Sequence, residues 1–142
     1  MPAGSQSVKV VIVDDSALLR QRLAAMISRL SGVEIAGEAR SVALELIRRW
    51  HPQAVVLDIR LKDGNGFDVL RQAKRGPGAP VVIMLTSFPS TKARQTCQAF
   101  GGDFFFDKAT EFERTIEVLT NLEFARRTSK SSEFKKLAGS GC

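Results

Sequence analysis

The chain has 142 residues, of which 44% are hydrophobic and 25% charged, a composition and length typical of one globular domain with a buried core. Because no stretch reaches the length of a membrane span and the first residues lack a secretory pattern, we expect a cytoplasmic protein without membrane contacts. Much of the net charge of +6 comes from basic residues after position 125, without interleaved aromatic residues, so nucleic acid is a poor candidate for a partner.

Short apolar runs and helical patterns alternate along the whole chain. The apolar runs, rich in β-branched or aromatic residues, predict five strands, at 8–13, 33–38, 54–58, 81–86 and 104–106. A helix is predicted after each strand, at 16–30, 41–50, 67–75, 90–100 and 111–127. Ser16 is the expected cap of the first helix and Gly32 its expected stop, while His51 before Pro52 closes the second and has a structural role.

This alternation predicts an α/β fold, a (βα)5 unit with helices on both faces of a five-stranded parallel sheet. The strands at 8–13, 54–58 and 81–86 are continuously apolar, as central strands are, whereas 33–38 alternates like an edge strand. The pattern matches the flavodoxin-like doubly wound order 2-1-3-4-5. A dinucleotide-binding fold is disfavoured because the loop after the first strand lacks a glycine-rich turn.

The domain is expected to span residues 8–127, preceded by a flexible N-terminus at 1–7. Residues 128–142 are rich in Ser, Lys and Gly, which predicts a disordered tail; whether it is an added extension, with Cys142 as a chemical handle, stays open. The other cysteine, Cys97, is expected to be a small helix residue, and the two have neither metal-ligand spacing nor the number for a disulfide framework.

Polar residues end the four apolar strands: Asp14-Asp15, Asp58, Thr86 and Lys108. The carboxyl ends of parallel strands lie at one edge of a sheet, so these side chains should gather there. Three neighbouring carboxylates either raise a carboxyl pKa or recruit a divalent cation, and oxygen ligands favour Mg²⁺ or Mn²⁺. Singly, an Asp after a strand is often a helix cap and Lys108 a surface lysine; their occurrence in this order indicates a site.

Four segments, VVIVDDSALLR, AVVLDIRLKDGNGFDVL, VVIMLTSF and FFFDKA, resemble the receiver domain of the two-component response regulators, typified by the chemotaxis receiver protein. The resemblance covers roughly residues 8–125. It implies a phosphorylation switch in which Asp58 accepts a phosphoryl group from a histidine kinase or a histidine phosphotransfer protein. It further implies that Mg²⁺ is held by Asp14, Asp15, Asp58 and the backbone carbonyl of Arg60. Thr86 and Lys108 would contact the phosphoryl group.

The resemblance also implies how the signal leaves the domain. Thr86 and Phe105 would form a switch pair, which changes partner binding through the face of the fourth helix, fifth strand and fifth helix. Phe105 stands where a tyrosine is often found, so its ring would act by burial; it can equally be an ordinary core residue. The partner would be an unknown downstream protein or, after phosphorylation, a second copy. The chain would be no enzyme beyond its own phosphorylation and slow dephosphorylation.

Two positions depart from the family pattern. Lys62 replaces a common proline and should loosen its loop, and the Arg60 side chain is expected to overlook the phosphoryl group and alter its lifetime. Three alternatives stay open: a pseudo-receiver that binds partners without phosphoryl chemistry, a receiver fragment of a longer regulator with an output domain, and an aspartyl-phosphate enzyme acting on a separate substrate. The complete residue set disfavours the first, and the lack of room for a substrate cap disfavours the last.

Overall fold

The computed structural model describes residues 7–39, 43–61 and 64–128. Five strands form the main sheet: β1 (Val8–Val13), β2 (Val33–Ala39), β3 (Ala54–Asp58), β6 (Val81–Thr86) and β7 (Phe104–Asp107). Five helices connect or follow them: α1 (Ala17–Ile27), α2 (Ala43–Trp50), α3 (Gly66–Ala73), α4 (Thr91–Ala99) and α5 (Arg114–Thr128). A short antiparallel hairpin, β4 (Arg60–Leu61) and β5 (Gly64–Asn65), lies between β3 and α3.

The main sheet has the order β2-β1-β3-β6-β7, and every neighbouring pair is parallel. This confirms the predicted flavodoxin-like order 2-1-3-4-5. The three central strands are nearly all apolar because side chains on both of their faces are covered by helices. All five residues of β3 are buried, including Asp58 at its end.

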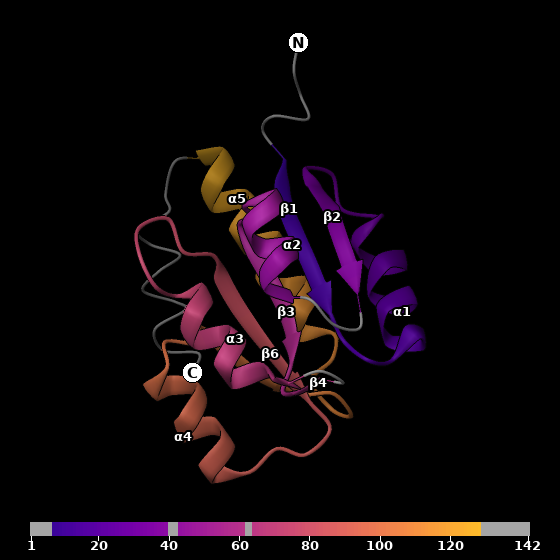
Figure 1. The fold of residues 1–142 in the computed structure, drawn as a ribbon. Helices are drawn as coiled ribbons and strands as arrows, with labels where there is room; N and C mark the ends of the chain where they lie inside the picture. Colours follow the sequence, from indigo (N-terminus) through magenta and orange to yellow (C-terminus); the bar gives the residue numbers. More distant parts are fainter. Residues whose placement is uncertain (1–6, 40–42, 62–63, 129–142) are drawn as a thin grey trace.

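Helices cover the sheet as two layers (Figure 1). Helices α1 and α5 pack on one face, where Val10, Ile12 and Val56 join one apolar cluster. Helices α2, α3 and α4 cover the other face, which Val11 and Val55 share. Because successive strand residues point to opposite faces, the run 104–106 divides, with its first and third rings in one cluster and the middle ring in the other.

Strand β2 lies at the sheet edge, as predicted, but its alternation is interrupted. Val10 pairs with Ile35 and Val11 with Gly37, so the residue between them is an extra one and forms a bulge. A Cβ atom at Gly37 would lie 3.3 Å from Leu46 of α2, which shows how closely that helix approaches the strand.

Several helix ends differ from the prediction. The cap of α1 is confirmed, since the Leu19 amide donates to Ser16 Oγ over 3.1 Å, but the helix ends at Ile27 rather than 30. Residues 28–31 form turns that lead to Gly32, whose φ of +81° is readily adopted by glycine. Helix α5 begins at Arg114 rather than 111, because the preceding residues form turns.

Some predictions concern residues outside the described ranges: the N-terminus at 1–6, the start of the second helix at 41–42, Lys62, and the tail at 129–142 with Cys142. The domain boundaries therefore stay predictions. No helix in the described part of the chain has the length and apolar character needed to cross a membrane.

Candidate functional site

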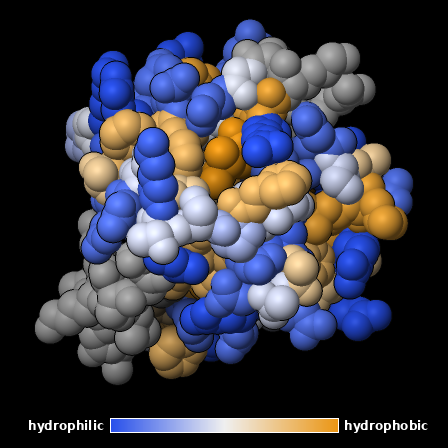
Figure 2. All heavy atoms as spheres, turned by 90° about the horizontal axis from the view of Figure 1, so that it is seen from below, coloured by the Kyte–Doolittle hydropathy of each residue, from blue (hydrophilic) through white to orange (hydrophobic). Residues whose placement is uncertain are grey.

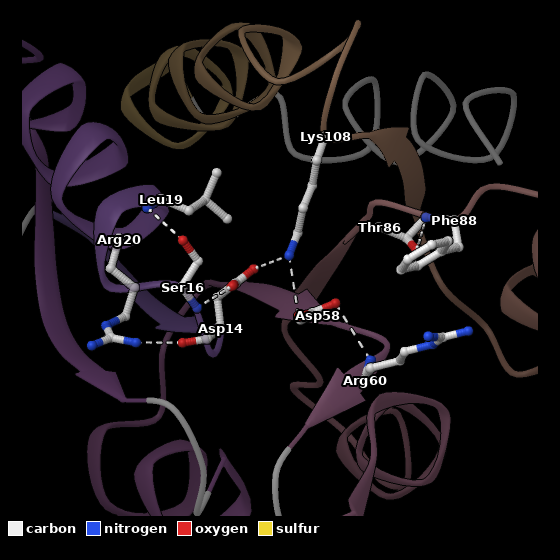
Figure 3. A network of polar contacts seen from close by, with 9 residues as sticks. All are labelled: Asp14, Ser16, Leu19, Arg20, Asp58, Arg60, Thr86, Phe88 and Lys108. Carbon is white, nitrogen blue, oxygen red and sulfur yellow. Dashed lines mark hydrogen bonds and ion pairs between the residues drawn. The ribbon is translucent and has the colours of Figure 1, made fainter.

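The carboxyl ends of β1, β3, β6 and β7 lie at one edge of the sheet, at the bottom of Figure 1. Figure 2 views the molecule from that side and shows hydrophilic side chains interspersed with apolar ones. Asp14, Asp58, Thr86 and Lys108 follow or end these four strands, and Figure 3 shows them together. The gathering predicted from the sequence is therefore present for these four residues.

Lys108 bridges the two buried carboxylates of this edge (Figure 3). Its Nζ lies 2.7 Å from Asp14 Oδ2 and 3.1 Å from Asp58 Oδ2. The side chains of Lys108, Asp14 and Asp58 are 15%, 1% and 11% exposed, so the ion pairs are largely shielded from water. The Lys108 amide also donates to the Thr86 carbonyl over 2.8 Å, which fixes the end of β7 to the end of β6.

The two adjacent aspartates have different environments. The Asp14 carboxylate accepts a hydrogen bond from the Ser16 amide at Oδ1, over 2.8 Å, and Arg20 donates to the Asp14 backbone carbonyl. Asp14 Oδ2 is buried and accepts no hydrogen bond, although it is ion-paired with Lys108. Asp15, in contrast, is exposed. The sequence predicted one acidic pair, but the structure buries only its first member.

Burial raises the pKa of the Asp58 carboxyl above its ordinary value, and the negative charge of Asp14 raises it further. Two contacts act in the opposite direction: the ion pair with Lys108 and the Arg60 amide, which lies 3.4 Å from Asp58 Oδ1. A raised carboxyl pKa is one of the two expected consequences of gathering aspartates, and burial together with Asp14 accounts for its direction.

The side chains of Thr86 and Arg60 both contact Phe88. The Phe88 amide donates to Thr86 Oγ1 over 3.0 Å, and the Arg60 guanidinium lies 4.3 Å from the centre of the Phe88 ring. Figure 3 shows the Arg60 side chain directed away from the carboxylates. The side chain that was expected to overlook the phosphoryl group is stacked on an exposed ring in this structure, which the sequence did not reveal.

Phe105 is 1% exposed and lies in the cluster beneath α2, α3 and α4. The Arg94 guanidinium of α4 lies 4.7 Å from its ring centre. The ring expected to turn inward is thus already buried in this structure, in a position that an ordinary core residue would share.

A divalent cation fits the donor chemistry of this edge. Among the residues that the structure describes, no three His, Cys, Asp or Glu side chains are arranged closely enough to hold a metal. Magnesium, however, commonly uses only one or two carboxylates and keeps several waters. Asp14 and Asp58 supply two buried carboxylates, and Asp14 Oδ2 has no hydrogen bond. Oxygen donors without His or Cys suit Mg²⁺ or Mn²⁺.

Two supporting residues were missed at the sequence level. Arg20 occurs four residues after the helix cap, a spacing that could have indicated a side chain returning to the turn. Gly66 is buried, and a Cβ atom there would lie 2.1 Å from the Asp58 carbonyl oxygen. The glycine-containing loop after Asp58 was a signal for close backbone approach, but nothing in the sequence distinguished Gly66 from Gly64.

Residues 10–120 match the response regulator receiver domain family. The chain belongs to this family. It is a receiver domain of a two-component response regulator, and the resemblance found in the sequence is confirmed.

Relatives and solved structures agree with this assignment. The receiver domain is 34% identical over 116 residues to the sensory transduction protein LytT of Bacillus cereus, covering 79% of this chain and 46% of that protein. It is 35% identical over 101 residues to a protein-glutamate methylesterase/protein-glutamine glutaminase of Pyrococcus horikoshii, covering 70% of this chain and 27% of that protein. The chain thus spans less than half the length of these relatives. A CheY-like receiver domain protein from Methanospirillum hungatei has the same fold, with a TM-score of 0.74, 18% identity, and coverage of 87% of this chain and 98% of that one.

Proposed function

We propose that this receiver domain is a phosphorylation-dependent signalling switch, in which Asp58 accepts a phosphoryl group from a histidine kinase or a histidine phosphotransfer protein. The observation that carries the proposal is the bridge of Lys108 between Asp14 and Asp58 at the sheet edge. It places one cation beside the carboxylate that would become phosphorylated, and phosphoryl transfer requires mainly positioning and charge neutralisation.

In the transfer, an ionised Asp58 oxygen attacks the phosphorus atom and forms a P–O bond. The P–N bond to the donor imidazole breaks, and its electron pair stays on the imidazole nitrogen. Burial disfavours the ionised form of Asp58, while Lys108 and the Arg60 amide favour it. Lys108 then pairs with a phosphoryl oxygen, and Thr86 donates to another after leaving the Phe88 amide.

A divalent cation, Mg²⁺ or Mn²⁺, would neutralise phosphoryl charge when bound. Asp14, Asp15, Asp58 and the Arg60 backbone carbonyl would hold it. The exposed position of Asp15 leaves its carboxylate accessible to a hydrated ion, while Asp14 is held in place by the Ser16 amide.

The output would pass through α4, β7 and α5. Thr86 ends β6, and Phe105 pairs with Met84 of the same strand, so a shift of Thr86 acts close to the Phe105 ring. Helix α4 buries only Cys97, and a helix anchored so thinly can change position at low cost. The resulting change would alter binding of a downstream protein or of a second copy. The chain would not act on a separate substrate.

A pseudo-receiver is the second candidate, because Lys108 pairs with both buried carboxylates, as it could in a domain that binds partners without phosphoryl chemistry. A receiver within a longer regulator is a further possibility, since the matched part covers 46% and 27% of two relatives. That alternative changes the partner of the switch and leaves its chemistry the same.

The test is phosphorylation by acetyl phosphate with Mg²⁺, followed by intact mass measurement. The wild-type protein should gain one phosphoryl mass, and Asp58→Asn should gain none. Asp68→Asn, an exposed aspartate in the first turn of α3, is the matched control and should be phosphorylated normally. No gain in the wild type would favour the pseudo-receiver, and rapid turnover without a trapped adduct would favour an enzyme.

A further inference from the structure

Arg20 connects the turn after β1 with the edge strand of the sheet. Its Nη1 donates to the backbone carbonyl of Asp14, and its Nε lies 3.4 Å from Oε1 of Glu38 on β2 (Figure 3 shows the first contact). The Arg20 side chain is 17% exposed and that of Glu38 is 41% exposed. Arg20 is therefore a half-buried cation that binds the main chain of the acidic turn.

The position of Arg20 follows from the start of α1. Ser16 caps this helix, and the Arg20 amide donates to the Ser16 carbonyl over 3.1 Å. Side chains of a helix lean toward its N-terminus, so an arginine in the first turns extends back over the cap. The planar guanidinium has donors in several directions and can bind a carbonyl and a carboxylate together.

Three residues from different parts of the chain restrain Asp14. The Ser16 amide binds Oδ1, Lys108 of the β7 end pairs with Oδ2, and Arg20 binds the main-chain carbonyl. The first two fix the carboxylate, whereas Arg20 fixes the peptide that joins Asp14 to Asp15. Because the direction of the Asp15 side chain depends on this peptide, Arg20 influences where both carboxylates can lie.

We propose that Arg20 is a positioning residue for the cation-binding turn at Asp14 and Asp15, oriented in turn by Glu38. This inference rests on the cation site of the proposed function. In this role Arg20 binds the main chain of the turn and restricts it to the conformation that presents the carboxylates. Residues that orient metal ligands commonly change metal affinity by about 10- to 100-fold when replaced.

The sign of the effect separates positioning from simple electrostatics. A positive guanidinium near the site repels a divalent cation, so its removal should strengthen cation binding if charge alone were important. Loss of positioning should weaken cation binding in spite of that relief. The two interpretations therefore predict opposite changes for Arg20→Gln.

The experiment is a direct titration with Mn²⁺, in which free Mn²⁺ is measured by electron paramagnetic resonance without any phosphodonor. Arg20→Gln should raise the Mn²⁺ dissociation constant about tenfold. Arg20→Lys keeps the positive charge and one donor direction, so its Mn²⁺ dissociation constant should lie between those of the wild type and Arg20→Gln. Glu38→Gln should have a smaller effect than Arg20→Gln, because its ion pair is partly exposed. Arg29→Gln, an exposed change of equal charge just after α1, is the control and should bind Mn²⁺ like the wild type.

Thermal unfolding and acetyl phosphate labelling complete the test. If Arg20→Gln fails to fold, the Mn²⁺ dissociation constant of Arg20→Lys is the test, and a value no higher than that of the wild type would overturn the inference. Unchanged or tighter Mn²⁺ binding by a folded Arg20→Gln would overturn the inference, as would a wild-type protein that binds no Mn²⁺. A wild type that binds Mn²⁺ but gains no phosphoryl mass would contradict the proposed phosphorylation. The role of Arg20 would still be decided by the Mn²⁺ titration of its variants.

Discussion

At the residue scale, Asp58 carries a charge in a place where charge is costly. Burial and the neighbouring Asp14 raise its pKa from the ordinary value of 3.8, while Lys108 only partly offsets them. A carboxyl whose pKa is raised by folding stabilises the folded protein most when it is protonated, and ionisation reduces that stability. The proposed phosphoacceptor therefore lowers the stability of the domain at neutral pH, where Asp58 is ionised.

This cost predicts a pH-dependent effect of Asp58→Asn. The amide has nearly the same shape and no charge, so the variant should unfold at higher denaturant concentration than the wild type at pH 7. The difference in unfolding midpoint between the variant and the wild type should be smallest below pH 3.8, where Asp58 is protonated even in the unfolded chain. It should grow as pH rises through the higher pKa that Asp58 has in the folded protein. Urea unfolding at several pH values measures it; a difference that shrinks with rising pH would contradict the assignment.

The sequence predicted which residues gather at this edge, but not how their side chains lie. Four strand-end motifs were enough to place Asp14, Asp58, Thr86 and Lys108 together, because parallel strands share one carboxyl edge. The burial of Asp14 beside an exposed Asp15, and the direction of Arg60, depend on side-chain packing across loops, which has no periodic signal in the sequence.

At the element scale, the chain after β3 is held against the start of α3 by a glycine. The Gly66 amide donates to the Ile59 carbonyl over 2.6 Å. A Cβ atom at Gly66 would lie 2.1 Å from the Asp58 carbonyl oxygen, whereas one at Gly64 would meet nothing within 4 Å. The hairpin of β4 and β5 thus returns the chain directly onto the Asp58 peptide.

Gly66→Ala should therefore destabilise the domain and disturb Asp58. Overpacking of backbone atoms typically costs about 1–3 kcal/mol in the free energy of unfolding, and we expect the upper half of that range. Gly64→Ala should change it by less than about 0.5 kcal/mol, as at most surface positions. Urea unfolding measures both, and equal effects of the two substitutions would show that the close approach at Gly66 has no energetic importance.

The stack of Arg60 on Phe88 joins the β4 segment to the connection between β6 and α4. In this arrangement Arg60 is kept from the phosphoryl position, and release of the stack would allow it to pair with phosphoryl oxygens and shield them from water. Phe88→Ala should therefore lengthen the phosphoryl lifetime by about two- to fivefold, the range of an exposed ion pair, and adding Arg60→Ala to Phe88→Ala should remove the gain. Intact mass after donor removal measures the lifetime. A Phe88→Ala lifetime equal to that of the wild type would remove this role.

Periodicity predicted the helices and strands well but not their ends. Ser16 and the apolar runs located α1 and the main strands, since capping and burial have direct sequence signals. The end of α1 at Ile27 and the bulge in β2 depend on how the chain packs at the sheet edge. The hairpin of β4 and β5 was missed because strands of two residues are too short to show alternation.

At the scale of the whole molecule, the helices on the two faces of the sheet near β7 differ in how many of their residues are buried. Helix α5 buries Thr115, Val118, Leu119 and Ala125, whereas α4 buries only Cys97. Phe105 lies in the same cluster as Cys97, and Arg94 of α4 covers its ring. A change at Thr86 therefore reaches α4 through a few contacts, and α5 remains the better anchored element.

Phosphorylation should accordingly change amide hydrogen exchange in α4 and in the connection from β6 more than in α5. Exchange in residues 87–100 should shift when the wild type is treated with acetyl phosphate and Mg²⁺, while α1, on the opposite face, should change little beyond its first turn. Asp58→Asn under the same treatment should show no shift in either place. Because the phosphoryl group alters only states that it contacts differently, a uniform change across all helices would indicate a general effect on stability. A change confined to α5 would instead show that the output does not depend on the weak anchoring of α4.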